Sequence, residues 1–172
     1  MNLSYLFLLP AVAALAVAFT RTAAQARMIA LTGSILQLGL VGKLLSDYRS
    51  MATDGFVFTQ RIPWFPSLHI DYFVGVDGIS LAMIALTSLV VLAGVLVSWN
   101  VERLTREFFL LLLLLSAGAY GFFISLDLFL QFFFLELAVI PKYLLIGIWG
   151  SSGYVRPPWR RMAVICDSSM RR

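Results

Sequence analysis

A carboxylate, a proline and a lysine interrupt the otherwise apolar stretch from 126 to 150. Glu136, Pro141 and Lys142 lie in a run that is long enough to cross a bilayer as a helix. An ionised side chain at the membrane centre costs about 2.5–3.5 kcal/mol on insertion scales, and such residues generally have a functional partner. Glu136 is therefore the first candidate for chemistry, and proton transfer is the chemistry that a carboxyl group offers there.

Pro141 and Lys142 give Glu136 an unusual helical environment. Pro141 has no amide hydrogen, so the carbonyl of Leu137 loses its helical partner, and water or a neighbouring side chain can replace it. The sequence therefore predicts a hydrated pocket at membrane depth. Lys142 is about 9 Å further along the helix and about 120° around it, so it cannot pair with Glu136 on one face. It either extends to the membrane boundary or faces a second channel.

Asp127 is the third candidate, about 13 Å before Glu136 on the same expected helix. A carboxylate at a helix start accepts hydrogen bonds from the first-turn amides and interacts favourably with the helix dipole. The sequence predicts this capping role for Asp127, and likewise for Asp77 before the expected span 79–99. A place on a proton path is the alternative role for Asp127.

The composition predicts an all-α integral membrane protein. Of 172 residues, 60% are hydrophobic and 13% are charged, and the mean hydropathy is +0.90. No soluble domain could bury so much apolar surface. We expect a membrane domain over 1–150 with five transmembrane helices and a short surface hairpin between the second and the third. The expected spans are 3–19, 28–45, 79–99, 108–125 and 127–149.

The basic residues predict the orientation of these spans. With five alternating helices, one side of the membrane carries most of the arginines, and positive loops stay in the cytoplasm. The amino terminus is then outside, in a multi-pass protein of the bacterial inner membrane. The first side holds Arg21, Arg27, Arg103, Arg106 and five arginines of the 151–172 tail, and the other side holds Lys43, Arg49 and Arg61.

The segment 151–172 has a different character from the rest of the chain. It is basic, and no apolar run in it is long enough for a sixth span. It is either a tail that lies on anionic lipid or the product of a truncated or frame-shifted coding sequence. Its charge is read as a sign of topology, so we expect no nucleic-acid partner. A single cysteine and a single histidine indicate that this chain holds no metal and no cofactor.

Two motifs resemble subunit M of NADH-quinone oxidoreductase, one of the antiporter-like membrane subunits of bacterial complex I. They are YFVGVDGIS at 72–80 and SLDLFLQFFFLELAVIPKYLLIGIWG at 125–150, with REFF between them. The resemblance implies that Glu136 is the family's conserved glutamate, which pairs with a lysine on a later helix. It also implies about fourteen helices, including two inverted five-helix repeats with broken helices.

The resemblance further implies a non-redox, proton-translocating subunit of an enzyme that oxidises NADH and reduces quinone. NADH, FMN, iron–sulfur clusters and quinone would bind in the complex but not in this chain, and the partners would be other complex I membrane subunits and the lipid bilayer. The chain departs from the family because the partner lysine is not in it. Two alternatives stay open: a subunit of a Mrp-type cation/proton antiporter or membrane-bound hydrogenase, and a non-functional truncated membrane fragment.

Overall fold

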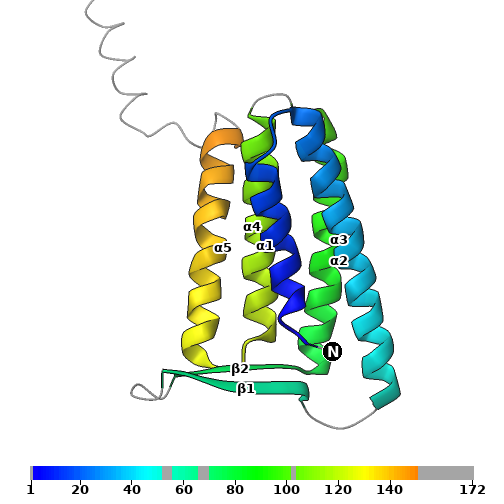
Figure 1. The fold of residues 1–172 in the computed structure, drawn as a ribbon, viewed down its shortest axis with the longest axis vertical. Helices are drawn as coiled ribbons and strands as arrows, with labels where there is room; N and C mark the ends of the chain where they lie inside the picture. Colours follow the sequence, from blue (N-terminus) through cyan, green and yellow to red (C-terminus); the bar gives the residue numbers. More distant parts are fainter. Residues whose placement is uncertain (1, 52–55, 66–69, 102–103, 151–172) are drawn as a thin grey trace, which may run out of the picture.

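The computed structural model describes residues 2–51, 56–65, 70–101 and 104–150. Within these ranges, α-helices stand side by side as an up-and-down bundle, and a two-stranded hairpin lies across one end (Figure 1). The elements in chain order are α1 (Tyr5–Ala18), α2 (Ala23–Met51), β1 (Val57–Phe65), β2 (Ile70–Val76), α3 (Gly78–Val97), a short 3-10 turn (Ser98–Asn100), α4 (Thr105–Ile124) and α5 (Leu128–Trp149).

The helices confirm the predicted all-α, multi-pass membrane class. Four helices, α2 to α5, are long and apolar enough to cross a membrane, and α1 is a shorter apolar helix of 14 residues. α2 begins at Ala23, earlier than the expected span 28–45. The cause is a reciprocal cap, because the Thr22 hydroxyl accepts from the Gln25 amide while the Gln25 side chain accepts from the Arg21 amide.

The helices of the described bundle alternate in direction (Figure 1). The last turns of α1, α3 and α5 lie at the end opposite the hairpin (Figure 1). Arg21 and Arg106 belong to that end, where the Arg106 guanidinium donates to the carbonyl of Thr20 at 2.9 Å. The cytoplasmic assignment of this end stays a prediction, and Arg103 and the basic tail at 151–172 lie outside the described residues.

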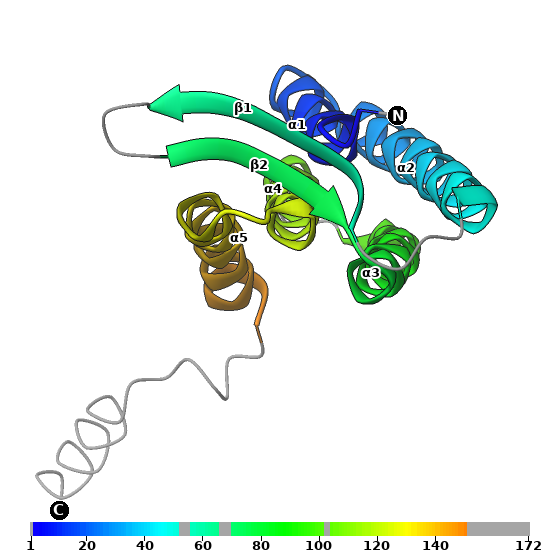
Figure 2. The ribbon, with the colours of Figure 1, turned by 90° about the horizontal axis from the view of Figure 1, so that it is seen from below.

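The predicted hairpin is confirmed, and it also contacts the connection between α4 and α5. β1 and β2 pair antiparallel and cross beneath the helix ends (Figure 2). The amide of Leu126 donates to the Phe73 carbonyl at 2.9 Å, and Val74 pairs with Ser125 as an isolated bridge. β2 therefore holds the turn from which α5 starts. His69, which could serve as a proton relay or simply as a loop residue, lies outside the described residues.

Asp127 and Asp77 cap α5 and α3, as their positions predicted. The Asp127 carboxylate accepts from the amides of Phe129 at 2.9 Å and Leu130 at 3.2 Å. The Asp77 carboxylate accepts from the Ser80 amide at 2.7 Å. Hydrogen bonds from the Ser80 side chain and amide hold the pKa of Asp77 below its usual range, so this cap is lost only as the pH falls through that lowered value.

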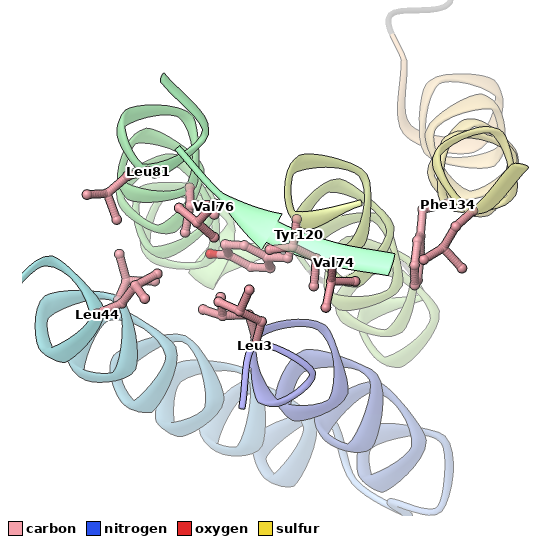
Figure 3. Close-up of a cluster of buried hydrophobic side chains, with 12 residues drawn as sticks. Leu3, Leu44, Val74, Val76, Leu81, Tyr120 and Phe134 are labelled. Atoms are coloured by element: carbon pink, nitrogen blue, oxygen red, sulfur yellow. The ribbon is translucent and has the colours of Figure 1, made fainter. Parts of the chain in front are cut away.

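One of the two buried hydrophobic clusters among the described residues lies directly under the hairpin (Figure 3). Val74 and Val76 of β2 are fully buried, and Tyr120 of α4 lies below them. Side chains from the amino terminus and every other helix meet there, including Leu3, Leu44, Leu81 and Phe134. This core joins β2 to the helices, so the hairpin is an integral part of the bundle.

Two glycines let α4 and α5 approach closely. A Cβ atom at Gly118 would lie 2.8 Å from the backbone nitrogen of Ala138, and one at Gly121 would overlap the Phe134 ring. Small residues at such positions are the usual means of close packing between membrane helices. On α2, a Cβ atom at Gly33 would lie 3.1 Å from the Cβ of Ala13 on α1, whereas a Cβ atom at Gly39 or Gly42 would meet no atom within 4 Å.

Replacement of Gly118 by alanine should destabilise the bundle by about 1–3 kcal/mol, because the neighbouring backbone of Ala138 cannot rotate away. Gly147→Ala is the matched control, since a Cβ atom at Gly147 meets nothing within 4 Å. Unfolding in mixed micelles, followed by circular dichroism, measures both variants. Equal effects of the two substitutions would contradict the close packing of α4 on α5.

Asp127→Ala should destabilise α5 by about 1 kcal/mol, because two first-turn amides lose their acceptor, whereas Asp127→Asn should preserve stability. The same unfolding experiment tests both variants. Loss of stability by the asparagine variant as large as that by the alanine variant would show that Asp127 does more than cap the helix.

Candidate functional site

Glu136 points away from the helix bundle. α5 packs on α4 through Leu130, Phe134 and Pro141, which are its buried residues. Their spacing of four and seven residues marks one helix face, and Glu136, two residues beyond Phe134, is about 200° around the helix from that side chain. The Glu136 side chain is accordingly exposed. Among the described residues, none forms an ion pair or a hydrogen bond with it.

The exposed surface around Glu136 is strongly apolar. In the most apolar stretch of α5, only 11% is buried against the rest of the chain, compared with 44% in the corresponding stretch of α4. α5 therefore stands at the edge of the bundle. The outward side chains are mainly phenylalanine and aliphatic residues. They include Phe129, Phe132, Phe133, Leu135, Val139, Ile140 and Ile146. A carboxylate in such a surface has no partner from the described part of the chain.

Lys142 and Tyr143 are the other polar residues on this outward side of α5. Both are exposed, and Tyr143 has 76% of its surface accessible. Lys142 forms no ion pair with Glu136, which agrees with the angular offset derived from the sequence. Whether Lys142 extends to the membrane boundary or faces a channel stays a prediction.

Each of the two prolines inside helices leaves the carbonyl four residues earlier without its helical amide, and the two carbonyls differ in whether a side chain donates to them. Pro10 of α1 leaves the Leu6 carbonyl without an amide, and the Gln37 side chain of α2 donates to it at 2.9 Å. Pro141 leaves the Leu137 carbonyl free in the same way. None of the side-chain hydrogen bonds seen among the described residues ends on Leu137.

A cavity of about 510 Å³ lies beside α5, but Glu136 does not line it. Its walls come from α1, the hairpin, α4 and α5, and they are almost entirely apolar, with Phe134 and Leu137 among them. Its polar edge is the contact between Ser4 and the Tyr72 hydroxyl, 2.9 Å apart. Burial raises the pKa of Tyr72, and the hydrogen bond with Ser4 partly offsets this. The hydrated pocket at Glu136 therefore stays a prediction.

The sequence did not single out Gln37, which is buried in the bundle. The signal was present, because Pro10 implies a free carbonyl four residues earlier, and that carbonyl requires a donor on a neighbouring helix. A metal centre is not visible in the described part of the chain, where no group of three or more histidine, cysteine or acidic residues converges. The expectation that cofactors bind elsewhere in a complex stays a prediction.

No protein-family model matches the chain. Among curated proteins, it is 33% identical over 148 residues to NAD(P)H-quinone oxidoreductase chain 4 1 of Synechococcus sp. (strain JA-3-3Ab), covering 86% of this chain and 28% of the relative. It is 36% identical over 126 residues to NADH-quinone oxidoreductase subunit M of Rhodobacter capsulatus, covering 73% and 24%. F(420)H(2) dehydrogenase subunit M of Methanosarcina mazei is 31% identical, with 87% and 30% covered.

Solved structures with the same arrangement of helices include two respiratory membrane complexes. A chain of respiratory complex I from Thermus thermophilus matches 86% of this chain and 29% of its own length, with a TM-score of 0.68 and 26% identity. A chain of an archaeal membrane-bound sulfane sulfur reductase covers 85% and 23%, with a TM-score of 0.72; at 18% identity it supports the fold alone.

The chain thus spans about 28% of the length of the first curated relatives that it matches. The Synechococcus relative is named chain 4 of NAD(P)H-quinone oxidoreductase, and the Rhodobacter relative is named subunit M of NADH-quinone oxidoreductase. The resemblance that the two sequence motifs indicated is confirmed. The chain is a homologue of the chain 4/subunit M membrane subunits of NAD(P)H-quinone oxidoreductases, the complex I family, over part of their length.

Proposed function

We propose that the chain is part of a proton-translocating membrane subunit of a respiratory NADH:quinone oxidoreductase, and that Glu136 carries the proton. The observation that supports this most strongly is the position of Glu136, an exposed carboxyl group midway along an apolar helix. A carboxylate in hydrocarbon is costly unless it is neutralised by a proton or by a cation. A residue that alternates between these two states moves a proton.

The cost of a carboxylate in hydrocarbon also implies that another element covers the outward face of α5 in the complex. The outward face of α5 is apolar around Glu136, and no other described element covers it. In the assembled complex, a membrane segment from outside the described residues would cover this face and bring a cationic side chain opposite Glu136. Other membrane subunits of the complex and the lipid bilayer are the proposed partners.

The proposed mechanism is electrostatic. A positive charge that approaches Glu136 favours the carboxylate and releases its proton, and a positive charge that withdraws favours proton uptake. The carbonyl of Leu137, free because of Pro141, would hold a water molecule next to the carboxyl group. Lys142 and Asp127 are secondary candidates, and the capping bonds of Asp127 already account for its position.

The redox chemistry would take place in other subunits of the complex. The names of the relatives refer to NADH or NADPH and quinone, and that of the archaeal relative refers to F420H2. We propose that NADH, FMN, iron–sulfur clusters and quinone belong to the complex and that this subunit is its non-redox translocase. The proposed location is the bacterial inner membrane, although one relative is chloroplastic.

A second candidate is an ion-translocating subunit of a membrane-bound hydrogenase or a Mrp-type cation/proton antiporter. The fold does not separate this candidate from the first, because a chain of the archaeal sulfane sulfur reductase has the same fold. The same carboxyl group would serve there, so Glu136 does not separate the two functions. Flavin and iron–sulfur subunits encoded beside this gene would favour the oxidoreductase.

Glu136→Gln in the membrane-embedded complex should abolish proton pumping, with a loss on the order of tenfold or more, because glutamine cannot exchange a proton. Pumping is followed in inverted membrane vesicles by quenching of a pH-sensitive dye during NADH oxidation, with quinone reduction recorded in parallel. Immunodetection of the subunit in the same vesicles shows that the variant is assembled.

Asp127→Asn and Lys142→Met are the matched controls on the same helix. Both should retain most of the pumping if Asp127 only caps α5 and Lys142 only extends to the membrane boundary. Full pumping by the Glu136→Gln vesicles, with normal assembly, would rule out the assignment of Glu136 as the proton carrier.

A further inference from the structure

A basic hollow lies at the end of the bundle opposite the hairpin, between the α1–α2 turn and the start of α4 (Figure 1). Its volume is about 320 Å³, many times the space that one water molecule needs. The lining, more polar than apolar, comes from residues 21–23 and 105–107. Two exposed arginines, Arg21 and Arg106, therefore line one space from two different elements.

Both arginines keep hydrogen-bond donors for a ligand. The Arg106 guanidinium is anchored, because one of its nitrogens donates to the Thr20 carbonyl at 2.9 Å. Its other N–H groups have no acceptor among the described residues, and the Arg21 side chain bonds to none of them. A guanidinium presents its N–H groups as a planar fork that matches the oxygens of a phosphate or carboxylate.

Arg27 of α2 adds a third positive charge beside the lining. Its guanidinium donates to the Val101 carbonyl at 3.1 Å, and the hydroxyl of Thr105, a lining residue, donates to the same carbonyl at 2.8 Å. The Nε atom of Arg27 is buried without a partner among the described residues. Glu107 is the one acidic residue in the described lining, and it forms no ion pair with these arginines. The described residues around the hollow thus carry an excess of positive charge.

Exposed apolar side chains place the hollow at the membrane surface. Phe19, which follows α1, and Val97, the last residue of α3, are each 85% exposed at this end of the bundle. Such side chains belong in hydrocarbon or at its boundary, whereas arginines belong among the lipid headgroups. The hollow therefore opens at the depth where the phosphate groups of lipids lie.

We propose that this hollow binds the phosphate group of an anionic phospholipid. The guanidinium groups of Arg21 and Arg106 donate charge-assisted hydrogen bonds to the phosphate oxygens, and the charge of Arg27 strengthens the attraction. The acyl chains lie along the exposed apolar side chains of the neighbouring helices. The site is independent of the proposed role of Glu136, because no residue of α5 belongs to it.

Native mass spectrometry of the full chain, released from micelles with added lipid, tests the site. The probes are phosphatidylglycerol and phosphatidylcholine with identical acyl chains, which differ in net charge. We expect the chain to bind phosphatidylglycerol more tightly. Arg21→Gln and Arg106→Gln should each weaken this binding by about fivefold, the effect of one basic residue at an anionic membrane surface. Glu107→Gln should strengthen it, because a repelling charge is removed.

Arg49→Gln is the matched control. Arg49 is also an exposed arginine without an ion pair among the described residues, but it lies in the last turn of α2, at the hairpin end. This variant loses the same charge and should bind phosphatidylglycerol as the unsubstituted chain does. If Arg106→Gln does not fold because its bond to Thr20 is lost, Arg21→Gln and Glu107→Gln decide, since neither removes a bond seen among the described residues.

Three results would overturn the proposal. Equal weakening by Arg49→Gln and Arg21→Gln would show that only the overall charge matters. Equal binding of the two lipids would leave an acidic segment of a neighbouring subunit as the occupant of the hollow. Displacement of phosphatidylglycerol by an equal concentration of inorganic phosphate would show that free phosphate, without acyl chains, is the ligand.

Discussion

Polar groups inside a bilayer must find partners within the protein, because hydrocarbon offers no hydrogen bonds. The bundle obeys this constraint at nearly every polar position among the described residues. Small hydroxyl side chains donate to carbonyls of their own helix, one turn earlier, as Ser34, Ser88 and Ser116 do. Gln37 reaches further and supplies the donor that Pro10 removed from α1. Polar side chains in the bundle therefore bond to carbonyls of their own helix or of a helix that packs against it.

Glu136 is an acidic group that breaks this rule within the described part of the chain. It lies in the outward face of α5, surrounded by phenylalanine and aliphatic side chains, while Asp127 on the same helix has its capping bonds. The Asp127 carboxylate accepts hydrogen bonds from amides of α5 itself. The Glu136 carboxylate can be neutralised only by a proton or by a partner beyond α5. The hairpin and the glycines of α4 hold α5 in place, so they set the direction in which Glu136 points.

Much of this arrangement could be predicted from the sequence. Apolar runs of about twenty residues located the spanning helices, β-branched and aromatic residues located the hairpin, and the residue types before each helix predicted the caps at Asp77 and Asp127. The early start of α2 was missed because the cap at Thr22 lies in a polar segment outside the apolar run. Gln37 was missed because pairing a free carbonyl with its donor requires knowing which helices are neighbours. For Glu136 the sequence indicated a function, but its orientation depends on tertiary packing.

The central claim is that Glu136 changes its protonation during turnover. Infrared difference spectroscopy of the intact complex, before and after reduction by NADH, measures this through the stretching band of a protonated carboxyl group. The account predicts a band that appears or vanishes with turnover and is absent in the Glu136→Gln complex. The same band, unchanged in that variant, would show that another group carries the proton.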